Sequence, residues 1–233
     1  MEVSFISFED VKAGALKDAD VVINAGRAGT AWSGGDAWKD AELVSRIQEW
    51  VYKGGVFLGV GEPSAAEGYQ DYFRMAQVLG IDEDTGARVC HGRWQYTIDK
   101  DTKKLVLPEV ADVPERPYLM LTDGKARVLA EKNKIPTAVI NGFGKGKGIY
   151  LSGFSLSNAN ARMLLNLMLY GMGLPLSQNY LTDNPDAECA YYPGTGKLVV
   201  INNSDRQVRT KVQTEKGVRE FTLAAFETVI EEA

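Results

Sequence analysis

The sequence has few of the residues on which most enzyme active sites depend. Its 233 residues include one histidine, His91, and two cysteines, Cys90 and Cys189. A site built from two histidines is therefore excluded, and any serine or cysteine triad would have to use His91. Adjacent side chains on an extended chain point to opposite faces, so Cys90 and His91 are not expected to react as a pair. The two separated cysteines form neither a disulfide framework nor a paired metal motif, so we expect a reducing environment and no metal site.

Excess positive charge and long apolar runs are also missing. The 31 acidic residues against 26 lysines and arginines give a formal net charge of -5, which does not favour nucleic acid or an anionic membrane as a partner. No apolar run approaches the roughly 20 residues of a transmembrane helix, and the N-terminus lacks the features of a signal peptide. The 45% of hydrophobic residues suffice for one or two cores. We expect a cytoplasmic protein.

The first 175 residues alternate short apolar runs with longer amphipathic segments. This alternation is typical of a largely parallel sheet crossed by helices. The first predicted strands cover residues 3–6, 19–24 and 56–60. The first predicted helices cover residues 11–17, 41–53 and 65–79. Asp40 is the expected N-cap of the second helix, and Gly54 is expected to end it.

The pattern weakens between residues 86 and 123 and then changes twice. In the weak stretch we expect two short strands, at residues 94–98 and 104–107. Three strands and a helix follow, at residues 126–130, 137–141, 148–152 and 158–171, with a glycine-rich hairpin turn before the third strand. After Pro175, five short strands about ten residues apart predict a small antiparallel domain. The sequence therefore predicts an α/β domain over residues 1–175 and a β-sandwich-like domain over residues 176–233.

The loop after the second predicted strand, residues 24–38, is the most informative stretch for function. It follows the carboxyl end of a strand, where open α/β sheets bind ligands. Its aromatic and polar side chains suit a sugar-binding wall, in which Arg27 and Asp36 hold hydroxyl groups or phosphate. The candidate binding residues are Asn24, Arg27, Thr30, Trp32, Ser33, Asp36 and Glu62. Alternatively, the loop packs on a neighbouring domain and its tryptophans are anchors.

Residues 59–64 form a strand-to-helix turn, the place where hydrolases and class I amidotransferases carry their nucleophile. The position of the nucleophile is Gly61, which has no side chain, and Ser64 is expected to cap the next helix. Glu62 either binds a ligand or lies beside that helix N-terminus, where an anion is favoured. Residues 150–157 occupy the place of the amidotransferase histidine and glutamate but contain neither. We therefore expect no catalytic residue on this chain.

Several motifs in the first 80 residues resemble those of a known family. They are residues 3–8 (Val-Ser-Phe-Ile-Ser-Phe), 20–26 (Asp-Val-Val-Ile-Asn-Ala-Gly), 28–35 (Ala-Gly-Thr-Ala-Trp-Ser-Gly-Gly), 50–55 (Trp-Val-Tyr-Lys-Gly-Gly) and 57–64 (Phe-Leu-Gly-Val-Gly-Glu-Pro-Ser). Residues 153–173 and 194–203 add support. Together these motifs resemble the galacto-N-biose/lacto-N-biose phosphorylases.

The resemblance implies a role within a larger enzyme. Enzymes of this family use inorganic phosphate to cleave, with inversion, a β-1,3 linkage between galactose and an N-acetylhexosamine, giving galactose 1-phosphate; relatives act on galactosyl-rhamnose. Their N-terminal (β/α)8 barrel holds the general acid and most sugar and phosphate contacts. This chain resembles only the later parts, a class I amidotransferase-like (flavodoxin-like) three-layer α/β domain and a small β domain. The opening on a predicted strand also indicates a start within a longer protein. We expect an inactive piece without a cofactor, whose candidate loop helps to close the barrel.

Two other functions remain open from the residues alone. Related β-galactosidases use a similar domain for assembly, so the chain is alternatively an oligomerisation or interaction module of another glycosidase. Trp32 and Trp38 alternatively suit a stand-alone domain that binds small sugars. A homo-oligomer is also expected, because apolar surface that the barrel normally covers favours association of the fragment. An assembly module predicts an oligomer indifferent to sugar, whereas a binding domain predicts saturable affinity without the barrel.

Overall fold

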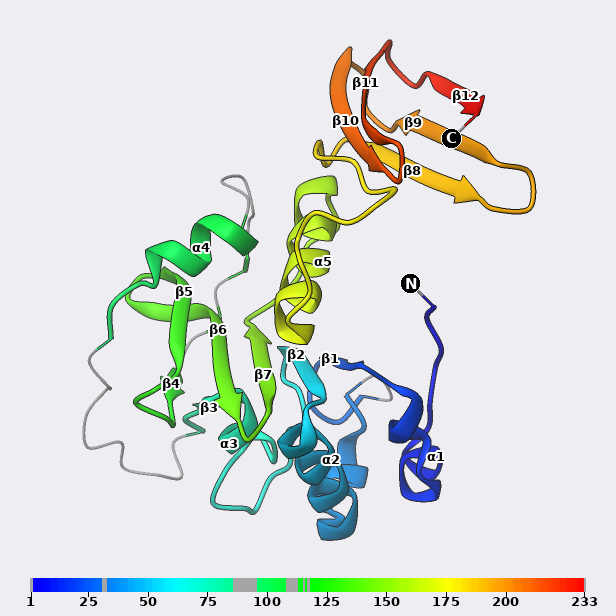
Figure 1. Ribbon diagram of the computed structural model, residues 1–233. Coiled ribbons are helices and arrows are strands. Elements are labelled where there is room, and N and C mark those ends of the chain that lie inside the picture. Colours follow the sequence, from blue (N-terminus) through cyan, green and yellow to red (C-terminus); the bar gives the residue numbers. More distant parts are fainter. Residues whose placement is uncertain are drawn as a thin grey trace. The chain divides into compact units, whose positions relative to one another are not determined.

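The computed structural model describes residues 2–30, 33–85, 96–107, 113–114, 116 and 118–232, and the structural statements below concern these residues. The chain divides into two compact units (Figure 1). The first comprises Met1–Ser155 and Asn166–Leu174, and the second comprises Leu156–Leu165 and Pro175–Ala233. The fold is mixed α/β with several sheets. No helix in the described part of the chain is both long and apolar enough to cross a membrane.

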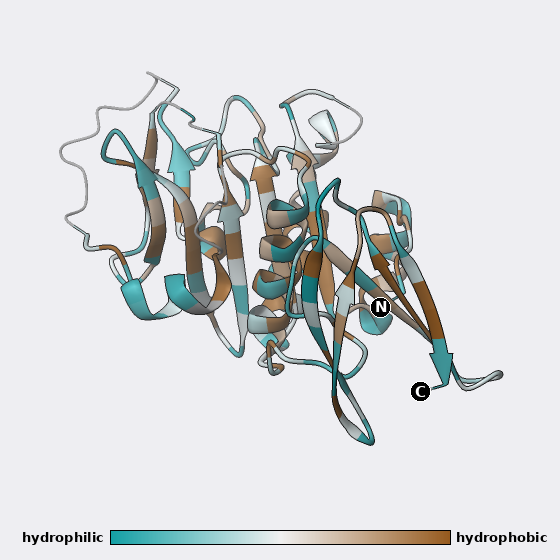
Figure 2. Cartoon of the chain, turned by 90° about the horizontal axis from the view of Figure 1, so that it is seen from above, coloured by the Kyte–Doolittle hydropathy of each residue, from teal (hydrophilic) through white to brown (hydrophobic). Residues whose placement is uncertain are grey.

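A five-stranded mixed sheet forms the centre of the first unit. Its order is β1 (Val21–Gly26), β2 (Val56–Gly61), β7 (Gly146–Leu151), β6 (Ile135–Phe143) and β5 (Arg127–Lys132). Strands β1, β2 and β7 run parallel, and β6 is antiparallel to both of its neighbours. Hydrophobic residues recur along the strands, shown in brown in Figure 2. Because β1, β2 and β7 are parallel, their carboxyl ends meet at one edge of the sheet, the carboxyl edge.

Helix α2 (Ala41–Lys53) confirms the most specific of the helix predictions. The Asp40 carboxylate accepts hydrogen bonds from the N–H groups of Glu42 and Leu43, at 2.9 and 3.3 Å, and the helix ends at Gly54. The face that α2 turns to the core carries the buried residues Leu43, Val44, Ile47 and Val51. Two short helices precede β1, α1 (Phe8–Ala13) and the 3-10 turn η1 (Ala15–Asp18), and a second 3-10 turn, η2 (Gly35–Lys39), precedes α2.

The helix predicted over residues 65–79 is wrong for most of its length, because only α3 (Ala76–Leu79) forms there. The buried Asp82 carboxylate accepts the N–H groups of Tyr72 and Phe73, at 3.1 and 2.7 Å. The next N–H, of Arg74, donates to the Ser64 carbonyl at 2.9 Å. The N–H groups of residues 72–74 therefore donate to distant acceptors and not to the carbonyls four residues earlier, as a helix requires. Tertiary contacts override the helical spacing of the apolar side chains.

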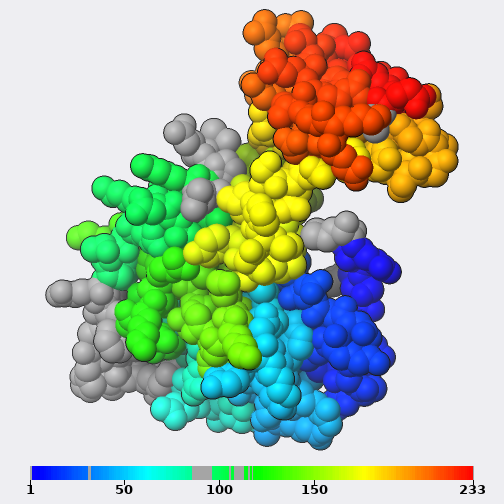
Figure 3. Space-filling model, in the orientation of Figure 1, coloured from blue at the N-terminus to red at the C-terminus, as the bar shows by residue number. Residues whose placement is uncertain are grey.

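Two short strand predictions are also wrong. Residues 104–106 belong to α4 (Lys100–Val106), and residue 107 is its C-cap; the N-cap Asp99 accepts the Thr102 N–H at 3.0 Å. Residues 3–6 form no strand, and the N-terminal segment lies at the surface, dark blue in Figure 3, with Phe5 95% exposed. Part of the strand predicted at residues 94–98 lies outside the described residues, as do Cys90 and His91. Strands β3 (Ile81–Glu83) and β4 (Leu119–Leu121) form a small antiparallel sheet.

The predicted hairpin of β6 and β7 is confirmed, and so is the helix that follows it. Gly144 in the hairpin turn has a φ of +61°, and a Cβ there would lie 2.5 Å from the backbone and ring of Tyr52. A side chain at this position is therefore excluded both by backbone conformation and by space. Helix α5 (Asn158–Met172) then supplies residues to both compact units.

The second unit contains five antiparallel strands, as the spacing of apolar residues predicts. Three of them form a sheet in the order β12 (Thr228–Glu232), β9 (Lys197–Asn202), β8 (Ala187–Tyr192). The other two, β10 (Val208–Thr214) and β11 (Gly217–Leu223), form a hairpin. The small core of this unit contains Leu198, Val200, Val212, Phe221 and Leu223. Alternate residues of β9 and β10 are buried, which is typical of strands with one face toward a core.

Candidate functional site

The carboxyl edge of the first sheet brings several of the predicted site residues together. Asn24 lies in β1, the loop of residues 27–40 follows β1, and Glu62 follows β2 directly. Asn24 is buried, and its side chain connects the two loops: Nδ2 donates to the Ser33 carbonyl at 3.3 Å, and Oδ1 accepts the Ser64 N–H at 2.8 Å. The amide of Asn24 is therefore used to hold these loops together.

Ser33 and Trp38 fix the loop from within. The buried Ser33 hydroxyl donates to the Arg27 carbonyl at 2.5 Å, and the Trp38 indole N–H donates to the Ser33 carbonyl. The Trp38 ring is fully buried and makes edge contacts with Phe8 and Phe57, at centroid distances of 5.4 and 6.3 Å. Trp38 is thus part of the core of its own unit, so it is neither a sugar-facing ring nor an anchor on a neighbouring domain.

Glu62 belongs to an ion-pair network with Arg116 and Glu83. Its Oε2 accepts the Ala28 N–H at 2.5 Å, and its Oε1 pairs with the Arg116 guanidinium. Arg116 Nε also donates to Glu83 at 2.6 Å. The Glu62 and Glu83 side chains are only 16% and 14% exposed. The expectation that Glu62 lies beside a helix N-terminus is wrong, because no helix follows it and the guanidinium is its counter-charge.

Two carboxylates sharing one guanidinium leave this network with a net negative charge. Burial raises the pKa of Glu83, and the hydrogen bond and charge of Arg116 oppose that shift. The Glu83 carboxylate therefore depends on Arg116 to remain ionised in a site with little water. We refer to Glu62, Glu83 and Arg116 as the carboxylate clamp, since they join the loop after β1 to two other segments.

The turn after β2, predicted as a strand-to-helix turn, contains structural hydrogen bonds in place of a nucleophile. Gly61 and Ser64 have φ values of +77° and +54°, so the turn is sharp. The buried Ser64 hydroxyl accepts the Met75 N–H at 3.1 Å, and since residues 65–75 are not helical, Ser64 does not cap a helix that follows it. The buried Tyr150 hydroxyl donates to the Gly61 carbonyl at 2.9 Å, and burial raises its pKa well above the ordinary value.

Of the remaining predicted residues, Arg27 and Asp36 are exposed and Thr30 is half-buried. Arg27 is exposed, and no carboxylate of the described residues forms an ion pair with it. The Thr30 hydroxyl donates to the Arg27 carbonyl at 2.7 Å, and the exposed Asp36 pairs with Lys39 at 2.7 Å. Trp32 lies outside the described residues. The structure thus separates an inner, bonded set (Asn24, Ser33, Glu62) from the exposed Arg27 and Asp36. The half-buried Thr30 is bonded within the loop, since its hydroxyl also accepts the Ser33 N–H at 3.4 Å.

Sequence analysis missed Arg116, Glu83 and Tyr150. Arg116 lies in the stretch of weak pattern between residues 86 and 123, where no periodicity indicates which way a side chain points. Glu83 ends the short strand β3, which the sequence did not indicate. Tyr150 was placed in a strand, but its partner, the Gly61 carbonyl, is 89 residues away in the chain. Among the described residues, no group of three or more His, Cys, Asp or Glu side chains is arranged to hold a metal ion.

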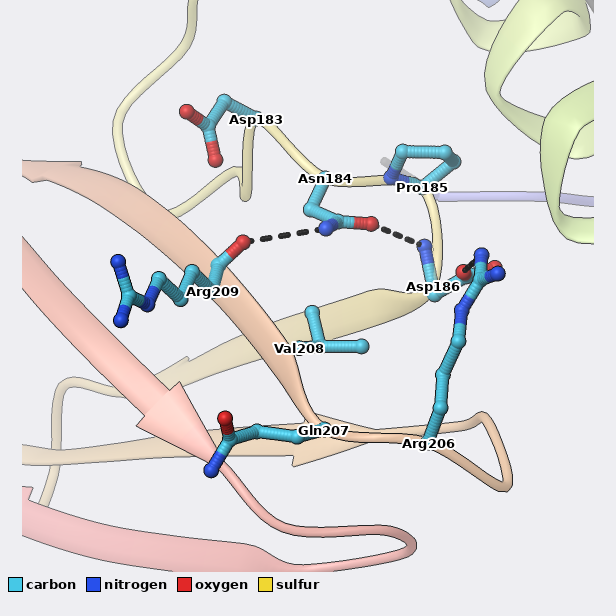
Figure 4. Close-up of a pocket in the computed structure, with 8 residues that line it drawn as sticks. All are labelled: Asp183, Asn184, Pro185, Asp186, Arg206, Gln207, Val208 and Arg209. Atoms are coloured by element: carbon cyan, nitrogen blue, oxygen red, sulfur yellow. Dashed lines mark hydrogen bonds and ion pairs between the residues drawn. The ribbon is translucent and has the colours of Figure 1, made fainter.

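The second unit contains an open polar cavity of about 530 Å³ (Figure 4). It is lined by Asp183, Asn184, Pro185, Asp186, Arg206, Gln207, Val208 and Arg209. Most of its polar groups bond to one another: Asp186 pairs with Arg206 at 2.8 Å, and the Asn184 amide joins the Arg209 carbonyl to the Asp186 N–H. It has no aromatic wall, and its charged groups are largely satisfied within the protein.

Comparison with known proteins gives one consistent family. The family model of the lacto-N-biose phosphorylase central domain matches residues 1–175, and that of the C-terminal domain matches residues 180–231. The chain is 47% identical to a D-galactosyl-β-1→4-L-rhamnose phosphorylase from Lachnoclostridium phytofermentans, over 98% of this chain and 31% of the relative. It is 32% identical to a 1,3-β-galactosyl-N-acetylhexosamine phosphorylase from Bifidobacterium longum, over 94% of this chain and 34% of the relative.

Solved structures of glycosidases also align with the chain. The GH42 β-galactosidase Gan42B aligns with a TM-score of 0.49 and 13% identity, over 94% of this chain and 32% of that one. The chain spans about a third of the length of the curated relatives it matches.

Proposed function

This chain belongs to the lacto-N-biose phosphorylase family, and we propose that it is the non-catalytic central and C-terminal part of a phosphorylase that cleaves a β-galactoside with inorganic phosphate. The names of both curated relatives above combine a galactosyl substrate with phosphorylase activity, which supports galactose 1-phosphate as the product. The greater identity to the galactosyl-rhamnose enzyme supports L-rhamnose as the leaving sugar. An N-acetylhexosamine is the alternative. Phosphate is a co-substrate, and no further cofactor is proposed.

The chemistry of such a reaction supports a catalytic centre on another domain. An inverting attack by phosphate requires one carboxylic acid to protonate the leaving oxygen, with the nucleophile on the opposite face of the sugar ring. Glu62 directly follows β2 at the carboxyl edge, Glu83 ends β3, and both accept hydrogen bonds from Arg116. A carboxylate held as an acceptor by a guanidinium is a poor proton donor. We therefore assign the general acid to an N-terminal barrel, as the family resemblance implies.

The loop of residues 27–40 is proposed to close the active site of that barrel. The observation that carries this role is the bracing of the loop: Asn24, Ser33 and Glu62 hold it from inside, while the Arg27 guanidinium is left exposed. A guanidinium on a braced loop is suited to bind phosphate or sugar hydroxyls with little loss of conformational freedom. Thr30, Trp32 and Asp36 are proposed to add contacts to the same face.

The architecture and assembly complete the proposal. The parallel strands β1, β2 and β7, with the sharp turn at Gly61 where a nucleophile would lie, support a class I amidotransferase-like, flavodoxin-like domain that lacks its catalytic residues. The exposed apolar side chains of Phe5 and Ile23 support a homo-oligomer or a contact with the barrel. A cytoplasmic location is proposed from the cysteine usage.

The proposal is tested with a chimeric enzyme. This chain replaces the matching third of the galactosyl-rhamnose phosphorylase from Lachnoclostridium phytofermentans, and galactose 1-phosphate is measured with each of the two disaccharides. We expect activity from the chimera and none from this chain alone. Turnover by the chain alone would refute the non-catalytic assignment. A folded chimera without activity, with thermal unfolding like that of the intact relative, would refute the phosphorylase role.

Arg27→Ala in the chimera tests the closing role of the loop. Losing a charge-assisted contact to substrate lowers kcat/KM by about tenfold or more. Lys17→Ala is the matched control, since Lys17 is an exposed cation in η1, before the amino end of β1 and away from the carboxyl edge. Equal activity of the two variants would exclude Arg27 from the active site.

A further inference from the structure

The second unit also contains a smaller and more enclosed cavity, which has an aromatic wall. Its volume is about 190 Å³, and it is lined by Tyr180, Tyr191, Gly196, Thr214, Glu215, Lys216 and Glu232. The rings of Tyr180 and Tyr191 stack nearly parallel, with centroids 4.1 Å apart and an angle of 9° between their planes. Both tyrosines are only half-buried. We call this cavity the tyrosine pocket.

The backbone around Tyr180 holds its ring against Tyr191. The Tyr180 N–H donates to the Gln213 carbonyl of β10 at 2.8 Å, and Tyr191 belongs to β8. Tyr180 has a φ of +61°, a left-handed conformation that is a genuine outlier for a bulky side chain. Such conformations persist where the surrounding structure fixes them, and they cluster at ligand-binding sites. The surrounding contacts therefore hold the Tyr180 backbone in an unfavourable conformation and fix the position of its ring.

Two carboxylates, Glu215 and Glu232, line the pocket together with the tyrosines. After burial, the nearby charge of Glu215 is the next cause that raises the pKa of Tyr180, so this carboxylate lies close to the phenol. Glu232 in β12 pairs through one oxygen with Lys197 at 2.6 Å, and its side chain is largely exposed. The hydrogen bond from Lys197 lowers the pKa of Glu232, and the charge of Lys216 adds to that shift. The pocket thus places carboxylate acceptors beside an aromatic surface.

We propose that the tyrosine pocket binds one hexose unit of a saccharide. The C–H groups of a pyranose face suit contact with the electron-rich face of a tyrosine ring, and sugar hydroxyls donate to carboxylates. The volume is below the roughly 300–1,000 Å³ of sites for drug-sized ligands, which favours a single small ring. The open polar cavity of Figure 4 lacks this aromatic surface. The tyrosine pocket is lined by residues of the second unit alone, whereas the loop of residues 27–40 belongs to the first.

The test is saturation-transfer difference NMR on the whole chain, with D-galactose, L-rhamnose and N-acetyl-D-glucosamine as probes. We expect saturable binding of at least one sugar, and Tyr180→Ala to weaken it by about tenfold, the loss of one good contact. Tyr191→Phe keeps the ring and is expected to retain affinity within about threefold. Tyr192→Ala is the matched control, because Tyr192 is the next residue in β8, 54% exposed and not part of the pocket lining.

Several results would overturn the proposal. One is the absence of sugar binding by the folded chain. Another is an equal loss of affinity in the Tyr180→Ala and Tyr192→Ala variants. If Tyr180→Ala unfolds the second unit, Glu232→Gln is tested in place of that variant. Glu232→Gln is expected to weaken sugar binding about threefold, and unchanged affinity would refute the proposal. Binding abolished by Arg27→Ala would assign recognition to the loop of the first unit. Because the barrel is absent from this measurement, its outcome does not depend on the phosphorylase role.

Discussion

The carboxylate clamp makes a quantitative prediction about stability. In the variant Arg116→Met, Glu62 and Glu83 lose their shared counter-charge while both side chains stay more than four-fifths buried. Removing one partner of a buried ion pair costs 3–5 kcal/mol, and because the clamp is slightly hydrated we expect the lower limit, about 3 kcal/mol. For a chain of this size each kcal/mol shifts the melting temperature by about 2–4 °C, so the expected decrease is about 6–12 °C.

Tryptophan fluorescence during urea unfolding measures this loss directly. All four tryptophans lie in the first 94 residues, so the signal reports the first unit. Arg46→Met is the matched control, because the pair of Arg46 with Glu42 on α2 is largely exposed and should contribute about 0.3–0.5 kcal/mol. The reasoning fails if Arg116→Met unfolds at the same urea concentration as Arg46→Met at pH 7.

The same variant has an expected pH dependence. Burial raises the pKa of Glu83 above its ordinary value of 4.5, and loss of Arg116 removes the interaction that opposes this shift. A carboxyl group with a raised pKa binds its proton more tightly in the folded state than in the unfolded state, so protonation stabilises the fold as the pH decreases. The difference in the free energy of unfolding between the variant and the wild type should be largest at pH 7 and should decrease toward about pH 4. A difference that increases on acidification would contradict the assignment.

Three further outcomes follow from other contacts. Asn24→Ala removes two buried hydrogen bonds between loops and should lower the free energy of unfolding by about 2–3 kcal/mol. The measurement is the rate of proteolysis within residues 27–40, which should increase, and cleavage at the wild-type rate would contradict the bracing role. Gly144→Ala places a Cβ against Tyr52 in a left-handed turn and should cost more than about 1 kcal/mol in urea unfolding; wild-type stability would disprove the clash. Burial raises the pKa of Cys189 to about 11, so its alkylation by iodoacetamide at pH 8, followed by mass spectrometry, should be much slower than that of free cysteine until urea is added; rapid labelling of the folded chain would refute this.

Local signals in the sequence predicted the elements that local contacts stabilise. Helix α2 was found because Asp40 and Gly54 mark its ends and its apolar stripe is regular. The helix predicted over residues 65–79 had equally regular apolar spacing, but the Asp82 carboxylate, in a different strand, binds the backbone that such a helix needs. Periodicity shows which side chains can share a face. It does not show which distant group competes for the backbone.

The same limit applies to the candidate site. Asn24 and Glu62 were expected at one edge of the sheet, because each follows or ends a parallel strand, and the structure places them there. Their partners were not predictable, since Arg116 is 54 residues from Glu62 in the chain and Ser64 is 40 residues from Asn24. The strand pattern therefore indicates where these side chains lie. Which of them are used for bracing, and which stay open for a ligand, depends on tertiary contacts.

Strand β1 is the last strand of its sheet, paired on one side with β2. Every second backbone N–H and C=O along its other side points away from the sheet, and Ile23 is 47% exposed. Natural edge strands are commonly protected by lysine, proline or a bulge, yet residues 21–26 contain neither lysine nor proline, and the pairing of β1 with β2 has no register shift. No residue of β1 opposes the addition of a sixth strand, so the free edge of this sheet is suited to pair with a strand from another segment or another chain.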